Sequence, residues 1–177
     1  MHKRTIGRFA LATALFMVLL TSAVPTRAAG IATGVLAAAA TVNLACSVSN
    51  SKNVSFGRIQ TPIGSKIGSD PPSTGNVSVT CNGGPYSIGL SVGNGAGASF
   101  ATRKMTSGSN TLNYSLYSTA DHSSVWGDGT PGSVTVSSPV DAAGTHDFPV
   151  YGLIFAPQSP EAGAYTDTIT VTVTFTP

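Results

Sequence analysis

The sequence carries little charge and few of the residues on which metal sites and enzymes depend. Lys, Arg, Asp and Glu together make up 9% of its 177 residues, and it has three histidines, two cysteines and one tryptophan. Ser, Thr, Gly and Asn supply most of its polar surface instead. So little charge weakens the usual protection of a strand edge against pairing with another chain. This is a liability for a monomeric enzyme but is acceptable in a protein that must polymerise.

A membrane-spanning apolar run is also missing near the N-terminus. The stretch "FALATALFMVLL" (Phe9 to Leu20) has 12 residues, whereas a helix needs about 20 to cross a bilayer. Basic residues precede it, and the small-residue stretch "TSAVPTRAAG" follows it. This order is typical of a secretory signal peptide. We expect residues 1–28 to be removed by cleavage after Ala28. Cleavage after Ala29 is the alternative, but it would put Arg27 at a position of the cleavage site that favours a small residue.

Processing reverses the charge of the protein. The leader holds four of the nine Lys and Arg residues and none of the seven acidic ones, so the exported part carries five basic and seven acidic residues, or −2. A protein without a basic patch cannot hold a nucleic acid backbone, so we expect no nucleic-acid partner. The remaining length of about 149 residues is enough for one domain with a sizeable core.

The two cysteines, Cys46 and Cys81, lie 35 positions apart in a chain that we expect to be exported. An even number of cysteines in an oxidising compartment favours a disulfide. Closing a loop of this length would stabilise the fold by about 4 kcal/mol on the chain-entropy model. A metal-binding pair is the alternative, but no histidine or second cysteine motif lies near it. We therefore expect neither a metal nor a cofactor.

After the leader, no long segment has the 3.6-residue period of a helix, and Gly, Pro and Ser-Asn clusters interrupt each apolar run. Short strands with frequent turns indicate an all-β sandwich or barrel in one domain. A polar loop is expected from Gln60 to Gly75. The expected strands are "TVNLACSVS", "NVSVTC", "YSIGLSVG", "ASFATRKMT", "LNYSLYS", "GSVTVSS", "HDFPVYGLIFA" and the terminal "GAYTDTITVTVTFTP".

Two segments stand apart from this pattern. The terminal strand places Tyr165, Ile169, Val171, Val173 and Phe175 at odd positions and threonines at even ones, which puts the apolar side chains on one face. The uncharged stretch "AGIATGVLAAAA" (Ala29 to Ala40) fits none of the expected strands. It is either a disordered tail or a strand that the domain cannot place within its own fold.

Several motifs, in order along the chain, resemble one known family. The segment "YGLIFAPQSPEAGAYTDTITVTVTF" (Tyr151 to Phe175) is similar to the C-terminal signature of the spore coat protein U domain, the family of archaic chaperone–usher pilus subunits. The resemblance covers essentially the whole exported chain. The other matching pieces are "ACSVS", "FG" at Phe56-Gly57, "VSVTCNGGPYSIGLSVG", "RKM", "LNYSLY" and "WGDG".

This resemblance implies an incomplete immunoglobulin-like β-sandwich that lacks its final strand and is completed by donor-strand complementation. Another chain supplies the missing strand, and the head-to-tail contact produces a fibre. The resemblance implies three regions: a signal peptide (1–28), a donor-strand extension (29–41) and a pilin-type sandwich (42–177). The donor anchors would be Ile31, Val35 and Leu36, in a register that could include Val42. The acceptor groove, which also binds the chaperone, would be flanked by Ile169, Val171, Val173 and Phe175.

The expected partners are a periplasmic pilus chaperone, an outer-membrane usher and identical or different pilus subunits. The subunit would pass through the periplasm to the surface fimbrium or be secreted. Alternatives within this family are a coat-layer protein and an adhesive tip or adaptor subunit. Tip subunits of the family carry an additional N-terminal binding domain, which counts against that alternative here. The extension is rich in Ala and Gly, so it would bury less apolar area than one with large anchors.

A catalytic function has little support in the sequence. Only His122 and His146 remain after processing, and no G-x-S-x-G motif is present. The glycine-rich "GNGAGA" is not followed by a helical segment that could bind phosphate, and "WGDGTPG" lacks the spacing of a calcium loop. We therefore expect no enzyme. Trp126 could touch a carbohydrate, but the burial habits of tryptophan favour packing over the end of the sandwich.

Overall fold

The computed structural model describes residues 37–68, 75–138 and 143–176, which form nine strands and no helix. Within these ranges, therefore, no helix is long and apolar enough to span a membrane. The chain divides into two units, residues 1–40 and 41–177. Of the first unit, Ala37–Ala40 are described; they are exposed and irregular. The expected signal peptide and the donor anchors Ile31, Val35 and Leu36 lie outside the described residues.

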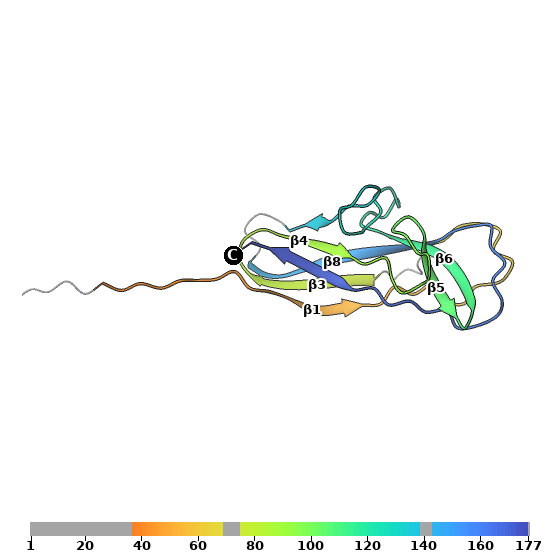
Figure 1. Cartoon of the computed structure of the whole chain (residues 1–177), viewed down its shortest axis with the longest axis horizontal. Helices are drawn as coiled ribbons and strands as arrows, with labels where there is room; N and C mark the ends of the chain where they lie inside the picture. The colour runs from red at the N-terminus through yellow and green to blue at the C-terminus, as the bar shows by residue number, and fades with distance from the viewer. Residues whose placement is uncertain (1–36, 69–74, 139–142, 177) are drawn as a thin grey trace, which may run out of the picture. The chain divides into compact units, whose positions relative to one another are not determined.

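The second unit is built from two antiparallel sheets (Figure 1). The larger sheet has the order β1-β3-β8-β6-β5, with β2 beside β8, and the smaller sheet has the order β7-β4-β9. Neighbours in sequence are often not neighbours in a sheet, as in a sandwich with crossing connections. The strands are β1 (Cys46–Lys52), β2 (Ile67–Gly68), β3 (Gly75–Asn82), β4 (Tyr86–Leu90), β5 (Arg103–Ser107), β6 (Asn110–Tyr117), β7 (Val136–Ser137), β8 (Ala143–Ile154) and β9 (Val171–Phe175).

The core lies between the two sheets, because alternate side chains of each strand point toward the other sheet. In β4, Tyr86, Ile88 and Leu90 are buried while the residues between them are partly exposed. The all-β, immunoglobulin-like sandwich expected from the sequence is confirmed. The buried apolar residues are Ile63, Val77, Val79, Cys81, Tyr86, Ile88, Leu90, Met105, Leu112, Tyr114, Leu116, Trp126, Val150 and Ile154.

Two further expectations are confirmed by the packing. Cys46 and Cys81 form a disulfide between directly paired positions of β1 and β3, with their Cα atoms 4.2 Å apart. This bond fastens an edge strand to the centre of the larger sheet. Trp126 is fully buried, and its indole nitrogen donates a 2.9 Å hydrogen bond to the carbonyl of Ile88. The expected packing of Trp126 against the sandwich, in place of an exposed binding role, is confirmed, although the side chain lies within the core and not only over its end.

Several strands are shorter than the sequence indicated, most of all β7, which keeps only Val136–Ser137 of the expected "GSVTVSS". In "ASFATRKMT" the strand begins only at Arg103, because Ser99 and Thr102 exchange backbone hydrogen bonds of 2.9 and 3.2 Å that close a turn. In the terminal segment the regular strand begins only at Val171. Before it, Thr166 bridges to Thr106 of β5. The terminal segment therefore leaves the edge of the larger sheet and joins the smaller one.

Candidate functional site

Strand β9 pairs with β4 along one edge and presents its other edge free within the described sandwich. Leu90 lies opposite Val171, but the Leu90 amide donates a 3.0 Å hydrogen bond in the other direction, to the carbonyl of Gly127. Val171 therefore occupies a non-hydrogen-bonded position of the β4–β9 ladder. Because these positions alternate along an antiparallel pair, the backbone groups of Val171, Val173 and Phe175 all point away from β4, toward the free edge.

The side chains of the same three residues form an apolar row beside that edge. Val171, Val173 and Phe175 are half-buried against the core, whereas the threonines between them are exposed. Ile169, just before the strand, is also half-buried against the core. The four residues that the family resemblance assigned to a groove thus lie in one row. A free edge with an apolar face is costly to leave uncovered and is a ready template for another strand.

A cavity of about 490 Å³ opens beside the beginning of β9. Ile169 and Val171 line it, but Val173 and Phe175 do not. Its other walls include core residues from both sheets, such as Leu90 of β4 and Leu116 of β6, which are only 2% and 3% exposed. The floor of this cavity is therefore formed by side chains of the core, which are themselves almost fully buried.

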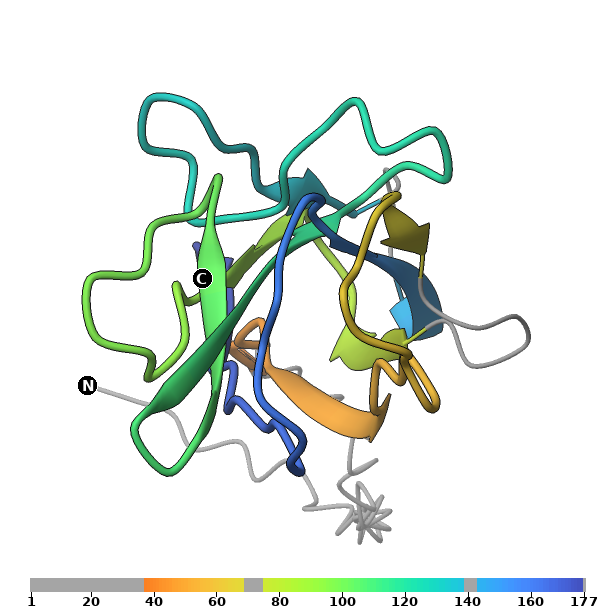
Figure 2. The ribbon, with the colours of Figure 1, turned by 90° about the vertical axis from the view of Figure 1, so that its right-hand side faces the viewer.

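A second cavity of about 520 Å³ extends the first. The two share four lining residues: Val54, Phe56, Met105 and Tyr165. Residues 160–165 form one wall of the second cavity, and residues 54–61 together with Ile63 form much of the other. In the end-on view, the dark-blue segment that leads into β9 passes between the β5–β6 hairpin and the yellow segment before β2 (Figure 2). We call the two joined cavities the trough.

The opposite wall of this opening belongs to β1, the edge strand of the larger sheet. Some Cα atoms of β1 and β9 lie within 8 Å of each other, although the two strands are not paired. Val48 lies two positions after Cys46 on the same face of the strand, yet it is 42% exposed. A large apolar side chain on the inner face stays exposed because no strand described in the sandwich covers this flank.

Asp167 belongs to the site but was not identified from the sequence. It occupies an odd position between Tyr165 and Ile169, so it interrupts the apolar row with a carboxylate that lines the first cavity. The carboxylate accepts 2.8 Å hydrogen bonds from the Tyr114 hydroxyl and from the backbone N–H of Asn94. Burial, together with the bond to Asp167, raises the pKa of Tyr114. The signal was present in the sequence as a polar residue in an otherwise apolar alternation.

Arg103 carries a fully buried positive charge behind the trough. Its guanidinium donates to three backbone carbonyls: Trp126 at 2.7 Å, Ser91 at 2.9 and 3.1 Å, and Phe100 at 3.3 Å. Burial lowers its pKa, and the nearby Tyr114 and Asp167 oppose that shift. The guanidinium ties three loops together, which keeps the wall beside β9 in place.

Among the acidic and histidine side chains of the described sandwich, Asp121, His122 and Asp128 lie in turns or bends. Hydrogen bonds from neighbouring hydroxyls lower the pKa values of Asp121 and Asp128, which cap their own turns. His122 packs edge-on against Tyr117, with ring centroids 5.1 Å apart. No group of three or more His, Cys, Asp or Glu side chains in these ranges is placed to hold a metal.

Comparison with known proteins agrees with this geometry. The family model of the Spore Coat Protein U domain matches residues 32–172. Among solved structures, a chain of the CsuC-CsuE chaperone–tip adhesion subunit pre-assembly complex, from archaic chaperone-usher Csu pili of Acinetobacter baumannii, has a similar fold. The TM-score is 0.52 at 22% identity, and the match covers 76% of this chain but 41% of that one. No curated protein matches the chain.

Proposed function

The chain belongs to the Spore Coat Protein U domain family, and we propose that it is a structural subunit of an archaic chaperone–usher surface pilus. In this proposal each subunit inserts its N-terminal segment into the trough of its neighbour and so polymerises head-to-tail. One observation carries the proposal: the free edge of β9 lies beside an opening that reaches the core. A protein that stayed alone would leave this edge and this apolar surface in water.

An added strand would pair the free backbone edge of β9 and cover the apolar surface beside it at the same time. Its backbone would pair with the outward-pointing groups of Val171, Val173 and Phe175, and alternate side chains would enter the trough. The segment 29–41 carries no charge, and its large apolar residues, Ile31, Val35 and Leu36, stand among small ones. Val35 and Leu36 are adjacent, so in an extended donor strand only one of the two faces the trough. A neutral segment suits the part of the trough that the core lines, because burying an unpaired charge there would cost several kcal/mol. We propose this segment as the donor and residues 42–177 as the acceptor domain.

The same edge explains the partners that we propose. Before assembly a periplasmic chaperone would cover β9 with a strand of its own, and an outer-membrane usher would exchange that strand for the extension of the next subunit. The assembled fibre would lie on the cell surface. A head-to-tail contact that does not close on itself yields a fibre. No catalytic role forms part of this proposal.

Deletion of residues 29–41 tests the polymerising role. Fibres of the full chain, sheared from producing cells, should appear as a ladder of multimers when heated only mildly in detergent. The deleted subunit should still form its disulfide and accept a strand, but it should give no ladder. If cells that make only the deleted subunit still produce fibres, residues 29–41 are not the donor and the proposal is wrong.

A further inference from the structure

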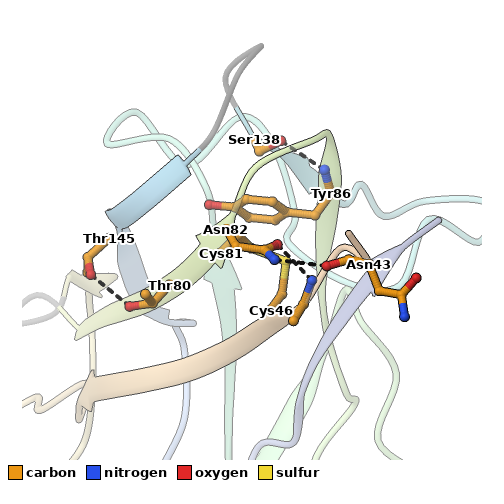
Figure 3. Close-up of a disulfide and its surroundings, with 9 residues drawn as sticks. Asn43, Cys46, Thr80, Cys81, Asn82, Tyr86, Ser138 and Thr145 are labelled. Carbon is orange, nitrogen blue, oxygen red and sulfur yellow. Dashed lines mark hydrogen bonds between the residues drawn. A yellow bond between two sulfur atoms is a disulfide. The ribbon is translucent and has the colours of Figure 1, made fainter. Parts of the chain in front are cut away.

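The side chain of Asn82 holds the chain just before β1 in place. Its amide oxygen accepts a 2.8 Å hydrogen bond from the amide of Ala45, and its amide nitrogen donates a 2.8 Å bond to the carbonyl of Asn43 (Figure 3). Its own backbone amide donates to the carbonyl of Ala45 at 3.1 Å. Together with the Cys46–Cys81 disulfide next to them, these bonds extend the β1–β3 pairing by two or three residues.

We call the hydrogen bonds from Asn82 to residues 43 and 45 the Asn82 clamp. Val42 comes directly before it and is 87% exposed, the most exposed of the large hydrophobic residues in the described part of the chain. An isolated exposed valine is unremarkable on most surfaces. Here, however, the next residue is fixed by Asn82, so the valine is presented at a defined position on the sandwich. It lies at the end where β3 finishes and where Tyr86 pairs with Phe175 at the end of β9.

The trough opens at the other end of the same strands. Its first cavity is lined by Lys52 and Asn76, a pair at the far end of the β1–β3 ladder from Cys46. The second cavity lies further on, past Tyr165, and its walls include the apolar side chains of Ile59, Ile63 and Leu112. The point where the chain enters β1 and the mouth of the trough are therefore at opposite ends of one sandwich.

We propose that Val42 of one subunit seats in the second cavity of the next subunit and closes the mouth of its trough. This inference rests on the proposed function, because it requires strand exchange between copies. The N-terminal extension of one subunit leaves its own sandwich near the end of β9 and enters the neighbouring subunit at the mouth of the trough. Followed from Val42 toward its N-terminus, the extension passes the neighbour's Tyr165 first and the neighbour's Phe175 last. The donor strand is then antiparallel to β9, with Val42 nearest residues 160–165.

The chemistry of the cavity fits this occupant. A volume of about 520 Å³ accommodates a valine together with the adjoining donor residues. Ile59, Ile63 and Leu112 supply an apolar part of its lining, which also contains Arg58, Gln60 and Glu161. Burial of Val42 would remove from water the largest apolar exposure in the described sandwich. The Asn82 clamp reduces the freedom that Val42 would lose on docking, which favours binding. Asn82 is thus a positioning residue for the junction between subunits.

Cysteine cross-linking in the assembled fibre tests this arrangement. Both native cysteines are in the Cys46–Cys81 disulfide, and no other cysteine is present, so an introduced pair can be followed cleanly. Full-length chains with Val42→Cys and Ala164→Cys should give disulfide-linked multimers in reducing-agent-free gels. Ala164 is small, exposed and lines the second cavity. Glu161→Cys, also exposed and in the same wall, provides a second acceptor position if the first variant folds poorly.

The matched control pairs Val42→Cys with Ser137→Cys. Ser137 is exposed in β7, at the end of the sandwich opposite to the second cavity. We expect at least tenfold more cross-linked multimer from the Val42–Ala164 or Val42–Glu161 pair than from this control. Fibres that form normally but cross-link no better than the control would overturn the placement of Val42 while leaving the proposed function intact. If the unmodified chain forms no fibres, the proposed function fails, and this inference fails with it.

Discussion

Leu90 and Val171 lie directly opposite each other in the β4–β9 ladder, and both line the first cavity of the trough. Leu90 is 2% exposed, whereas Val171 remains half-buried at the free edge. The pair marks the point where the hydrophobic core of the sandwich reaches the surface. A strand laid along β9 would cover Val171 and seal this opening, which is the binding mode that we propose.

A charge at Val171 should abolish strand acceptance. Val171→Asp places a carboxylate against the buried side chain of Leu90, and burying it without a partner costs several kcal/mol. We expect at least a tenfold loss of fibre, measured as the yield of sheared multimer. Thr172→Asp is the matched control, because Thr172 is exposed on the outer face. Equal losses from both substitutions would show that the inner face of β9 is not a binding surface.

Reduction of the Cys46–Cys81 disulfide should loosen the β1 wall of the trough. On the chain-entropy model, loss of this disulfide costs about 4 kcal/mol. It also releases an edge strand whose only strand partner among the described residues is β3. Urea unfolding with and without a reducing agent, supported by the Cys46→Ser/Cys81→Ser double variant, measures this. An unchanged unfolding midpoint would contradict the structural role of the disulfide.

Arg103→Lys should destabilise the sandwich although it keeps the charge. A lysine ammonium has no planar fork of donors, so it cannot reproduce the bonds to the carbonyls of Ser91, Phe100 and Trp126. Carbonyls left buried without donors make the expected loss about 3 kcal/mol in urea unfolding. Lys104→Ala removes one peripheral bond of 3.2 Å to Ala96 and should cost under about 0.5 kcal/mol. Similar losses for both variants would argue against a special role for Arg103.

Asp147 should make the stability of the sandwich depend on pH in the acidic range. Hydrogen bonds from Ser78 and Asn76 lower its pKa in the folded state. A carboxyl whose folded pKa is lowered stabilises the fold above its unfolded pKa of about 4, and this contribution is lost as pH falls through the folded value. Asp147→Asn should therefore be less stable than the native chain at pH 7. The difference should shrink as the pH falls below about 4; a difference that stays constant with pH would contradict this assignment.

The sequence predicts the apolar face of the terminal strand well, because strict alternation from Ile169 to Phe175 has one structural meaning. It predicts the disulfide and the burial of Trp126 for similarly local reasons of compartment and residue type. Alternation alone did not reveal that Thr166 pairs with β5 before the strand joins β4. That crossing depends on hydrogen bonds between distant segments, which no local pattern encodes.

The polar parts of the site were harder to anticipate. The place of Asp167 in the row is visible in the sequence, but the apolar residues around it dominate the alternation, so the pattern alone does not mark it as part of the site. The burial of Arg103 could not be predicted, since its partners are carbonyls of three separate loops. The side chain of Asn82 imitates a strand partner for residues 43–45, which only the folded register shows.

The measurement that tests the account most directly is thermal unfolding of the oxidised sandwich without residues 29–41, alone and with a synthetic peptide of residues 29–42. The account predicts a large rise in the unfolding midpoint and a stable one-to-one complex, because the peptide supplies the strand that the edge of β9 lacks. A sandwich that is already stable alone and whose midpoint does not change with the peptide would contradict it, since its fold would then be complete without a donor.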